Sequence, residues 1–183
     1  MRTAAIARSL AHIPLAAETG AIIILGLLRG VLKPGVSRRQ AMDWIVAALD
    51  EICAAAVRQN VRIALEPINR YETPLINRAD EGMEVIRRVG AQNLGLLLDT
   101  FHMNIEEPNI AESIRACGDR LFHFHVADSN RWYPGAGHLD FPSILGALRA
   151  TGYSGFVSAE YVPLPDAESS AAYALAHLRQ AGA

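Results

Sequence analysis

The 183-residue sequence is poor in cysteine, which limits the disulfides and the cysteine-bound metal sites that it could form. It contains only Cys53 and Cys117, and the two do not form a CxxC pair. We therefore predict two reduced thiols in or near helices. A disulfide or a cysteine-bound zinc ion is not expected, and a cytoplasmic location is favoured.

Basic runs and long apolar runs are also missing. The 17 Lys and Arg residues are spread along the chain and give a formal net charge of −2, so neither nucleic acid nor an anionic membrane surface is an expected partner. Arg2 and the small residues after it could open a secretory signal, but Arg8, His12 and Glu18 interrupt the stretch. The apolar run at 21–28 is too short to span a bilayer, so we expect no transmembrane segment.

What the sequence does contain is a regular alternation of apolar strands and amphipathic helices. We predict strands over 21–28, 61–67, 94–99, 121–127 and 155–161. We predict helices over 2–19, 37–60, 78–89, 110–117, 141–151 and 166–180. Because the strands are almost continuously apolar and helices separate them, the pattern indicates an α/β domain over 1–183 with a parallel sheet covered by helices.

A parallel sheet can be open and doubly wound, or it can close into a (β/α)₈ barrel. The GLLRG segment after the first strand does not satisfy the GxGxxG pattern of doubly wound dinucleotide-binding domains. The residues at the strand ends converge in type, which is typical of a barrel mouth. The strand count does not fit a complete barrel, because only five strands are predicted, whereas a barrel has eight strands and about 250 residues.

Four of the predicted strands end in a residue that can bind a divalent metal ion. These residues are Glu66, Asp99, His125 and Glu160. The C-terminal ends of parallel strands meet on one side of a sheet, where barrels and doubly wound folds place their chemistry. Carboxylates and one imidazole form a hard, mostly oxygen-donor set that suits Mn²⁺ or Mg²⁺. The sequence therefore predicts a metal site at these strand ends.

Some of the polar residues near these strand ends also have an ordinary structural interpretation. Asp99 could cap the segment that follows its strand, and Arg131 could pair with Asp128. His123 and His125 lie on the same side of their strand, so both could point inward. The residue pattern alone does not decide between these interpretations.

Longer segments surround the four strand ends: LEPINRYE (65–72), LLDTFHMNIEE (97–107), HFHVADSNRWYPGAGHLDF (123–141) and VSAEYVPLPD (157–166). In this order they resemble the xylose-isomerase-like barrel superfamily, and within it the ketose 3-epimerases of the tagatose/psicose type. The segments DTFHMNIEE and HFHVADSNR are most similar to the 5-keto-L-gluconate epimerase-like proteins. The resemblance covers essentially the whole chain.

This resemblance implies an activity and a set of roles. One divalent metal ion, most often Mn²⁺ and otherwise Mg²⁺ or Co²⁺, would be bound by the four strand-end residues. The substrate, a ketose or keto-sugar acid, would be contacted by Glu72, His102 and Arg131, although Glu72 could also be a solvated charge. The implied reaction is epimerisation next to the ketone through an enediolate, with Glu66 and Glu160 exchanging the protons.

Aligned on these motifs, the chain begins in the helix before the family's fourth strand, so the resemblance implies a partial barrel of the TIM type with about five βα units. We therefore expect exposed edges at 21–28 and 155–161, and a homo-oligomer that covers them. Three interpretations are open: an incomplete product, a barrel completed by another polypeptide, or a self-associating sheet. The alternative functions are an aldose–ketose isomerase of the hydroxypyruvate or xylose type, a dehydratase of an inositol-like substrate, and a noncatalytic metal-binding fragment that needs a partner.

Overall fold

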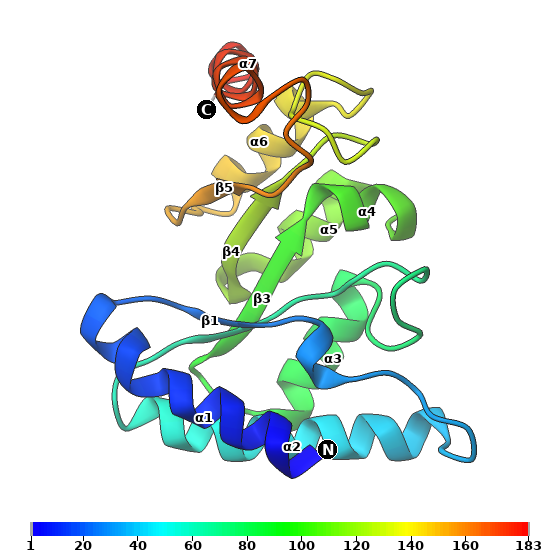
Figure 1. Ribbon diagram of the computed structural model, residues 1–183, viewed down its shortest axis with the longest axis vertical. Helices are drawn as coiled ribbons and strands as arrows, with labels where there is room; N and C mark the ends of the chain where they lie inside the picture. Colours follow the sequence, from blue (N-terminus) through cyan, green and yellow to red (C-terminus); the bar gives the residue numbers. More distant parts are fainter. Residues whose placement is uncertain (1, 183) are drawn as a thin grey trace. The chain divides into compact units, whose positions relative to one another are not determined.

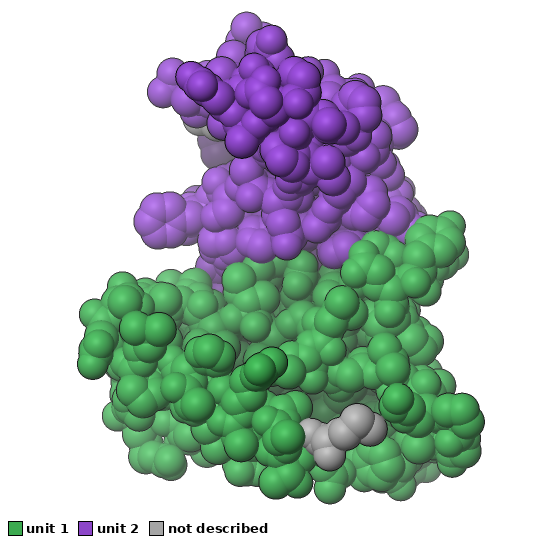
Figure 2. All heavy atoms as spheres, viewed as in Figure 1, with its two compact units in different colours: residues 1–97 green, residues 98–183 purple. Residues whose placement is uncertain are grey.

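The computed structural model describes residues 2–182, and the chain divides into two compact units, Met1–Leu97 and Leu98–Ala183 (Figure 2). Unit 1 contains, in chain order, α1 (Arg2–Thr19), β1 (Ile23–Leu25), η1 (Leu27–Arg29), α2 (Arg38–Val57), β2 (Ile63–Leu65), α3 (Ala79–Val89) and most of β3 (Leu94–Asp99). Unit 2 contains the end of β3 and then α4 (Thr100–Glu106), α5 (Ile110–Cys117), η2 (Gly118–Arg120), β4 (Leu121–Val126), α6 (Phe141–Ala150), β5 (Val157–Ala159) and α7 (Ala167–Gln180).

The strands follow one another in chain order within the sheet, β1-β2-β3-β4-β5. Parallel pairing joins β1 to β2, β2 to β3, and β4 to β5, and Leu65 of β2 is the register partner of both Leu25 and Leu96. Helices separate successive strands; in unit 1, α1 and α2 lie side by side (Figure 1). This is the order of consecutive βα units in a TIM barrel, and it confirms the prediction of a partial barrel.

Several element ends lie where local sequence signals place them. The Ser37 hydroxyl accepts a hydrogen bond from the Gln40 N–H at 3.2 Å and caps α2. Gly90 ends α3 with a φ of 74°, a left-handed conformation that favours glycine. β3 and α5 have the predicted bounds. These signals act within a few residues, so the sequence is enough to locate them.

The prediction of a buried strand over 21–28 was wrong in length and in burial. The strand covers only Ile23–Leu25, and the chain then turns through Gly26 into η1. Among the described strands β1 has one neighbour, β2, and 39% of Ile24 is exposed. β5 is likewise short and has one neighbour. β2 is equally short although it has two neighbours, so apolar content overestimated strand length both at the edges of the sheet and inside it.

The helix α4 was not predicted, and it begins directly after β3. Asp99 is its N-cap: the Asp99 Oδ1 accepts a hydrogen bond from the Phe101 N–H at 2.8 Å. The structure thus confirms the capping interpretation of Asp99. The detectable signal was an aspartate followed by residues that continue without a glycine or proline up to Pro108.

Each unit has its own apolar core. In unit 1, Ile45, Leu49 and Ile52 of α2 are buried together with all three residues of β2. In unit 2 the largest buried side chains are Phe124 and Phe141. Both cysteines are unpaired and lie in helices, as predicted, and both are buried. Among residues 2–182, no helix combines the length and apolar character that crossing a membrane requires.

Candidate metal centre

The four strand-end residues lie where the sequence predicts them. Glu66 directly follows β2, Asp99 is the last residue of β3, and Glu160 directly follows β5. His125 is the penultimate residue of β4. Glu66 belongs to unit 1, whereas the other three belong to unit 2.

In unit 2, Asp99, His125 and Glu160 form a cluster, because one donor atom from each lies within 4.8 Å of the others. His125 Nδ1 is 3.0 Å from Glu160 Oε2 and 4.0 Å from Asp99 Oδ2. The Asp99 side chain is fully buried, whereas 49% of the Glu160 side chain is exposed. The cluster thus runs from the interior of unit 2 to its surface.

Arg131 completes this cluster from the loop that follows β4. Its Nη1 donates to Asp99 Oδ2 at 2.9 Å, and its Nη2 donates to Glu160 Oε2 at 3.0 Å. The guanidinium also lies over the Phe101 ring, 4.7 Å from the ring centre. The Arg131 backbone has a φ of 64°, which is uncommon for a residue with a side chain. The alternative in which Arg131 pairs with Asp128 was wrong.

Asp128 instead organises the loop that carries Arg131. Its buried carboxylate accepts hydrogen bonds from the N–H groups of Ser129, Gly135 and Leu139 at 2.7, 2.8 and 3.1 Å. Burial acts to raise the pKa of Asp128, but the backbone N–H groups outweigh it and hold that pKa below its usual value. A Cβ added to Gly137 would lie 2.2 Å from Asp128 Oδ1, so this close approach requires a glycine.

The two carboxylates of the cluster have pKa values shifted in opposite directions. Burial raises the pKa of Asp99 to about 6, although the charge of Arg131 acts to lower it. The hydrogen bond with His125 lowers the pKa of Glu160 to about 2, against the effect of its partial burial. Additional positive charge nearby would stabilise the ionised form of the buried Asp99 carboxylate. Two carboxylates and an imidazole nitrogen are also donors that Mn²⁺ and Mg²⁺ accept, so the cluster fits a divalent cation.

Glu66 sits in a confined place in unit 1. Only 9% of Glu66 is exposed, and its backbone N–H donates to the Leu25 carbonyl at 3.2 Å. A Cβ added to Gly26 would come within 2.7 Å of Glu66 Oε2. The glycine after β1 therefore leaves the space that the Glu66 carboxylate uses.

The residues expected to contact substrate have different environments. Arg131 belongs to the unit 2 cluster, and His102 is buried on α4 with its ring 5.6 Å from that of Phe101. Glu72 is an exposed residue of unit 1 and accepts a hydrogen bond from Asn69 Nδ2 at 2.9 Å. Contact of these three with a substrate stays a prediction.

His123 is a neighbour of the cluster that sequence reasoning left undecided. Its ring meets the His125 ring edge-on, with the centres 5.0 Å apart. Burial, together with the adjacent His125, lowers the pKa of His123, which favours its neutral form. His123 therefore supports the His125 ring from the side.

Comparisons with known proteins agree with this architecture. L-ribulose 3-epimerase of Methylomonas sp. (strain DH-1) is 40% identical over 127 residues, which are 69% of this chain and 44% of that protein. D-psicose 3-epimerase of Enterocloster bolteae is 41% identical over 110 residues, 60% of this chain and 36% of that protein. The crystal structure of 3-keto-D-glucoside 4-epimerase from E. coli superposes with a TM-score of 0.88 at 29% identity, covering 96% of this chain and 70% of that one.

The chain thus spans less than half the length of these two curated relatives. The family called xylose isomerase-like TIM barrel matches residues 1–181, which is nearly the entire sequence. The strand order, the strand-end residues and this match agree, and the chain belongs to the xylose isomerase-like TIM barrel family.

Proposed function

We propose that this chain is a metal-dependent sugar epimerase, or part of one, that acts at the carbon next to a ketose carbonyl. The observation that carries the proposal is the cluster of Asp99, His125 and Glu160, with Arg131 bonded to both carboxylates. Similarity to ketose 3-epimerases and to a keto-sugar 4-epimerase supports it. The proposed substrate is a ketose or keto-sugar acid, and the proposed location is the cytoplasm.

Glu66, Asp99, His125 and Glu160 would hold one divalent cation, with Mn²⁺ as the first candidate and Mg²⁺ or Co²⁺ as alternatives. Glu66 joins the unit 2 cluster in this proposal because the resemblance to the ketose 3-epimerases implies it. When bound, the cation supplies positive charge beside the substrate oxygens that become negative as the proton leaves.

Two glutamates carry the proton transfers in the proposed reaction. One carboxylate takes the C–H proton from one face of the carbon next to the ketone, which leaves an enediolate. The other glutamate, starting protonated, returns a proton to the opposite face, and exchange with solvent restores both. Glu160 is ionised at neutral pH and half exposed, which suits a base that must reach the substrate. Glu72, His102 and Arg131 would hold the substrate oxygens.

The comparisons favour an epimerase over an aldose–ketose isomerase. The 3-keto-D-glucoside 4-epimerase inverts the carbon beside a keto group, and the two curated relatives are ketose 3-epimerases. At either position, removal and return of a proton at the same carbon would invert the configuration, which is the chemistry proposed for this chain. An isomerase would return it to a different carbon.

The test is solvent deuterium exchange in D₂O with Mn²⁺ and a panel of ketoses and keto-sugar acids, followed by NMR. We expect deuterium at the carbon next to the carbonyl, and a loss of about 100-fold or more in Glu66→Gln and Glu160→Gln. Glu84→Gln, on the exposed surface of α3, is the matched control. Deuterium in an aldose product would favour the isomerase. Binding of Mn²⁺ without exchange on any sugar would favour the noncatalytic fragment.

We also propose that the outer strands associate with a second copy of the chain. β1 and β5 each have one neighbour among the described strands, and Ile24 and Val157 on them are 39% exposed. Phe156, directly before β5, is 82% exposed. Light scattering is expected to report an oligomer, and a well-folded monomer at micromolar concentration would contradict this.

A further inference from the structure

The GLLR segment after β1 has no role in the proposed chemistry, yet its arginine is unusually well bonded. Arg29 ends η1, and all five of its side-chain N–H groups have a backbone carbonyl as acceptor. Nη1 donates to Gly26 O at 2.9 Å and to Glu66 O at 2.7 Å. Nε and Nη2 donate to Leu75 O at 3.3 and 2.9 Å, and Nη2 also donates to Ile76 O at 3.0 Å.

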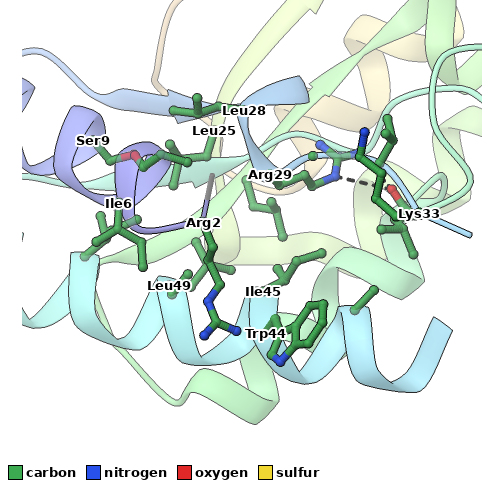
Figure 3. Close-up of a pocket in the computed structure, with 18 of the residues that line it drawn as sticks. Arg2, Ile6, Ser9, Leu25, Leu28, Arg29, Lys33, Trp44, Ile45 and Leu49 are labelled. Carbon is green, nitrogen blue, oxygen red and sulfur yellow. Dashed lines mark hydrogen bonds between the residues drawn. The ribbon is translucent and has the colours of Figure 1, made fainter. Parts of the chain in front are cut away.

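Arg29 lies at the edge of an apolar cavity of about 450 Å³ in unit 1 (Figure 3). Its Nη2 donates to the Leu75 carbonyl, and Leu75 also lines this cavity. Because every N–H already has a carbonyl acceptor, the guanidinium has no donor left for a ligand in the cavity. Its role is therefore within the protein.

The carbonyls that Arg29 contacts belong to three segments far apart in sequence. They are the exit of β1 at Gly26, the residue after β2 at Glu66, and the loop at 75–76. The hydrogen bond to Glu66 O fixes the peptide that follows the Glu66 Cα, and this restricts the direction of its side chain. Arg29 thus holds the backbone of Glu66, whereas Gly26 leaves room for its side-chain carboxylate.

The chemistry of the guanidinium explains why this position holds an arginine. Its planar fork presents N–H groups in several fixed directions, whereas the ammonium of lysine has a single nitrogen and cannot span three segments. Burying a cation among carbonyls is unfavourable unless its donors are satisfied, and here they all are. The arrangement thus specifies one geometry for the backbone around Glu66.

We propose that Arg29, together with Gly26, is a positioning residue that fixes Glu66 for metal binding and proton transfer. This inference rests on the proposed function, which gives Glu66 those two roles. It assigns Arg29 no contact with substrate or cation. The GLLR segment then supports the site through the Glu66 backbone, directly after β2.

The test compares Arg29→Lys and Gly26→Ala with a matched control, Arg38→Lys. Arg38 also donates to a carbonyl of the same loop, that of Pro74, but its second partner is the Glu81 carboxylate instead of the backbone at Glu66 or Gly26. Two quantities are measured: amide hydrogen exchange of the metal-free chain at Glu66, and the Mn²⁺ dissociation constant from the free-Mn²⁺ EPR signal. Cooperative thermal unfolding establishes that each variant is folded.

In Arg29→Lys we expect both the Glu66 exchange rate and the Mn²⁺ dissociation constant to rise about tenfold or more. Gly26→Ala is expected to weaken Mn²⁺ binding to a similar extent, because its methyl group displaces the carboxylate. Arg38→Lys should stay within about twofold of wild type in both measurements. Values for Arg29→Lys within about twofold of wild type would overturn the inference.

If Arg29→Lys does not fold, the Mn²⁺ affinity of Gly26→Ala tests the inference in its place. An affinity equal to that of wild type would overturn the inference. A wild-type chain that binds no Mn²⁺ contradicts the proposed function instead. In that case hydrogen exchange at Glu66 still decides whether Arg29 holds this residue. The two failures are therefore distinguishable.

Discussion

Arg131 donates a hydrogen bond to Asp99 Oδ2 at 2.9 Å, while the other oxygen of Asp99 caps α4 through the Phe101 N–H. The two oxygens of one buried carboxylate therefore have different roles. Oδ1 fixes the helix that begins after β3, and Oδ2 faces Arg131 and His125. The cap holds the carboxylate in place, so Oδ2 is presented to the cluster in a defined orientation.

The stability of the metal-free chain should depend on pH through Asp99. Burial raises the pKa of Asp99 from its ordinary 3.8 to about 6, so the folded state binds this proton more tightly than the unfolded state. The resulting stabilisation is fully present below the ordinary pKa and is lost as the pH rises through about 6. Urea unfolding with EDTA, compared between wild type and Asp99→Asn, should show the wild-type advantage shrinking from about pH 4 to about pH 7.

Glu160 provides a comparison of opposite sign. Its pKa is lowered from 4.5 to about 2, so its contribution is present above 4.5 and is lost as the pH falls through about 2. In Glu160→Gln the wild-type advantage should therefore shrink toward acid. For Asp99, a difference in the free energy of unfolding between wild type and Asp99→Asn that grows as the pH rises would contradict the prediction.

Replacing Arg131 should destabilise the metal-free chain and make it more responsive to Mn²⁺. Arg131→Gln removes two charge-assisted hydrogen bonds and leaves Asp99 buried with less positive charge nearby. We expect the free energy of unfolding to fall by about 1–3 kcal/mol, and saturating Mn²⁺ to recover part of the loss. Urea unfolding with and without Mn²⁺ measures both effects.

The control for Arg131 is Arg87→Gln, which removes an exposed helix pair with Glu84. It should change the free energy of unfolding by less than about 0.5 kcal/mol. Equal losses in the two arginine variants would show that the contacts of Arg131 add no stability specific to this cluster.

Asp128 should prove necessary for the loop that carries Arg131. In Asp128→Asn, one carboxylate oxygen becomes an NH₂ group that faces backbone N–H donors, so at least one hydrogen bond is lost. We expect a loss of about 1–3 kcal/mol in the free energy of unfolding, together with slower deuterium exchange of the substrate. Asp119→Asn, at an exposed position of η2, is the matched control. Similar stability and activity in both variants would argue against this role of Asp128.

The two cysteines should be unreactive in the folded chain. Burial raises the pKa of each thiol, that of Cys53 and that of Cys117, to about 12, so almost no thiolate is present at neutral pH. A thiol reagent such as DTNB should detect neither thiol in the native chain and both after unfolding in guanidinium chloride. Rapid reaction of a native thiol would contradict the predicted burial.

Much of the fold was predictable because its signals are local. Ser37 and Gly90 mark helix ends by chemistry that acts within one turn, and the continuous apolar run of β3 gave its exact bounds. β1 was mispredicted for the opposite reason. The length of a strand depends on the strand it pairs with, and residues 21–28 alone do not show which of them will pair with β2. The helix α4 escaped prediction because no turn residue separates it from β3: Asp99 is both the last residue of the strand and the N-cap of the helix.

The sequence by itself determined the order of strands and helices and the strand-end positions of Glu66, Asp99, His125 and Glu160, because these depend on patterns within short segments. Only the tertiary structure decided which partners those residues have. The Arg131 guanidinium bonds to the carboxylates of Asp99 and Glu160, and the Arg29 guanidinium bonds to the carbonyl of Glu66. These contacts join residues about 30 to 40 positions apart, so they exist only once folding has brought the strand ends and their loops together.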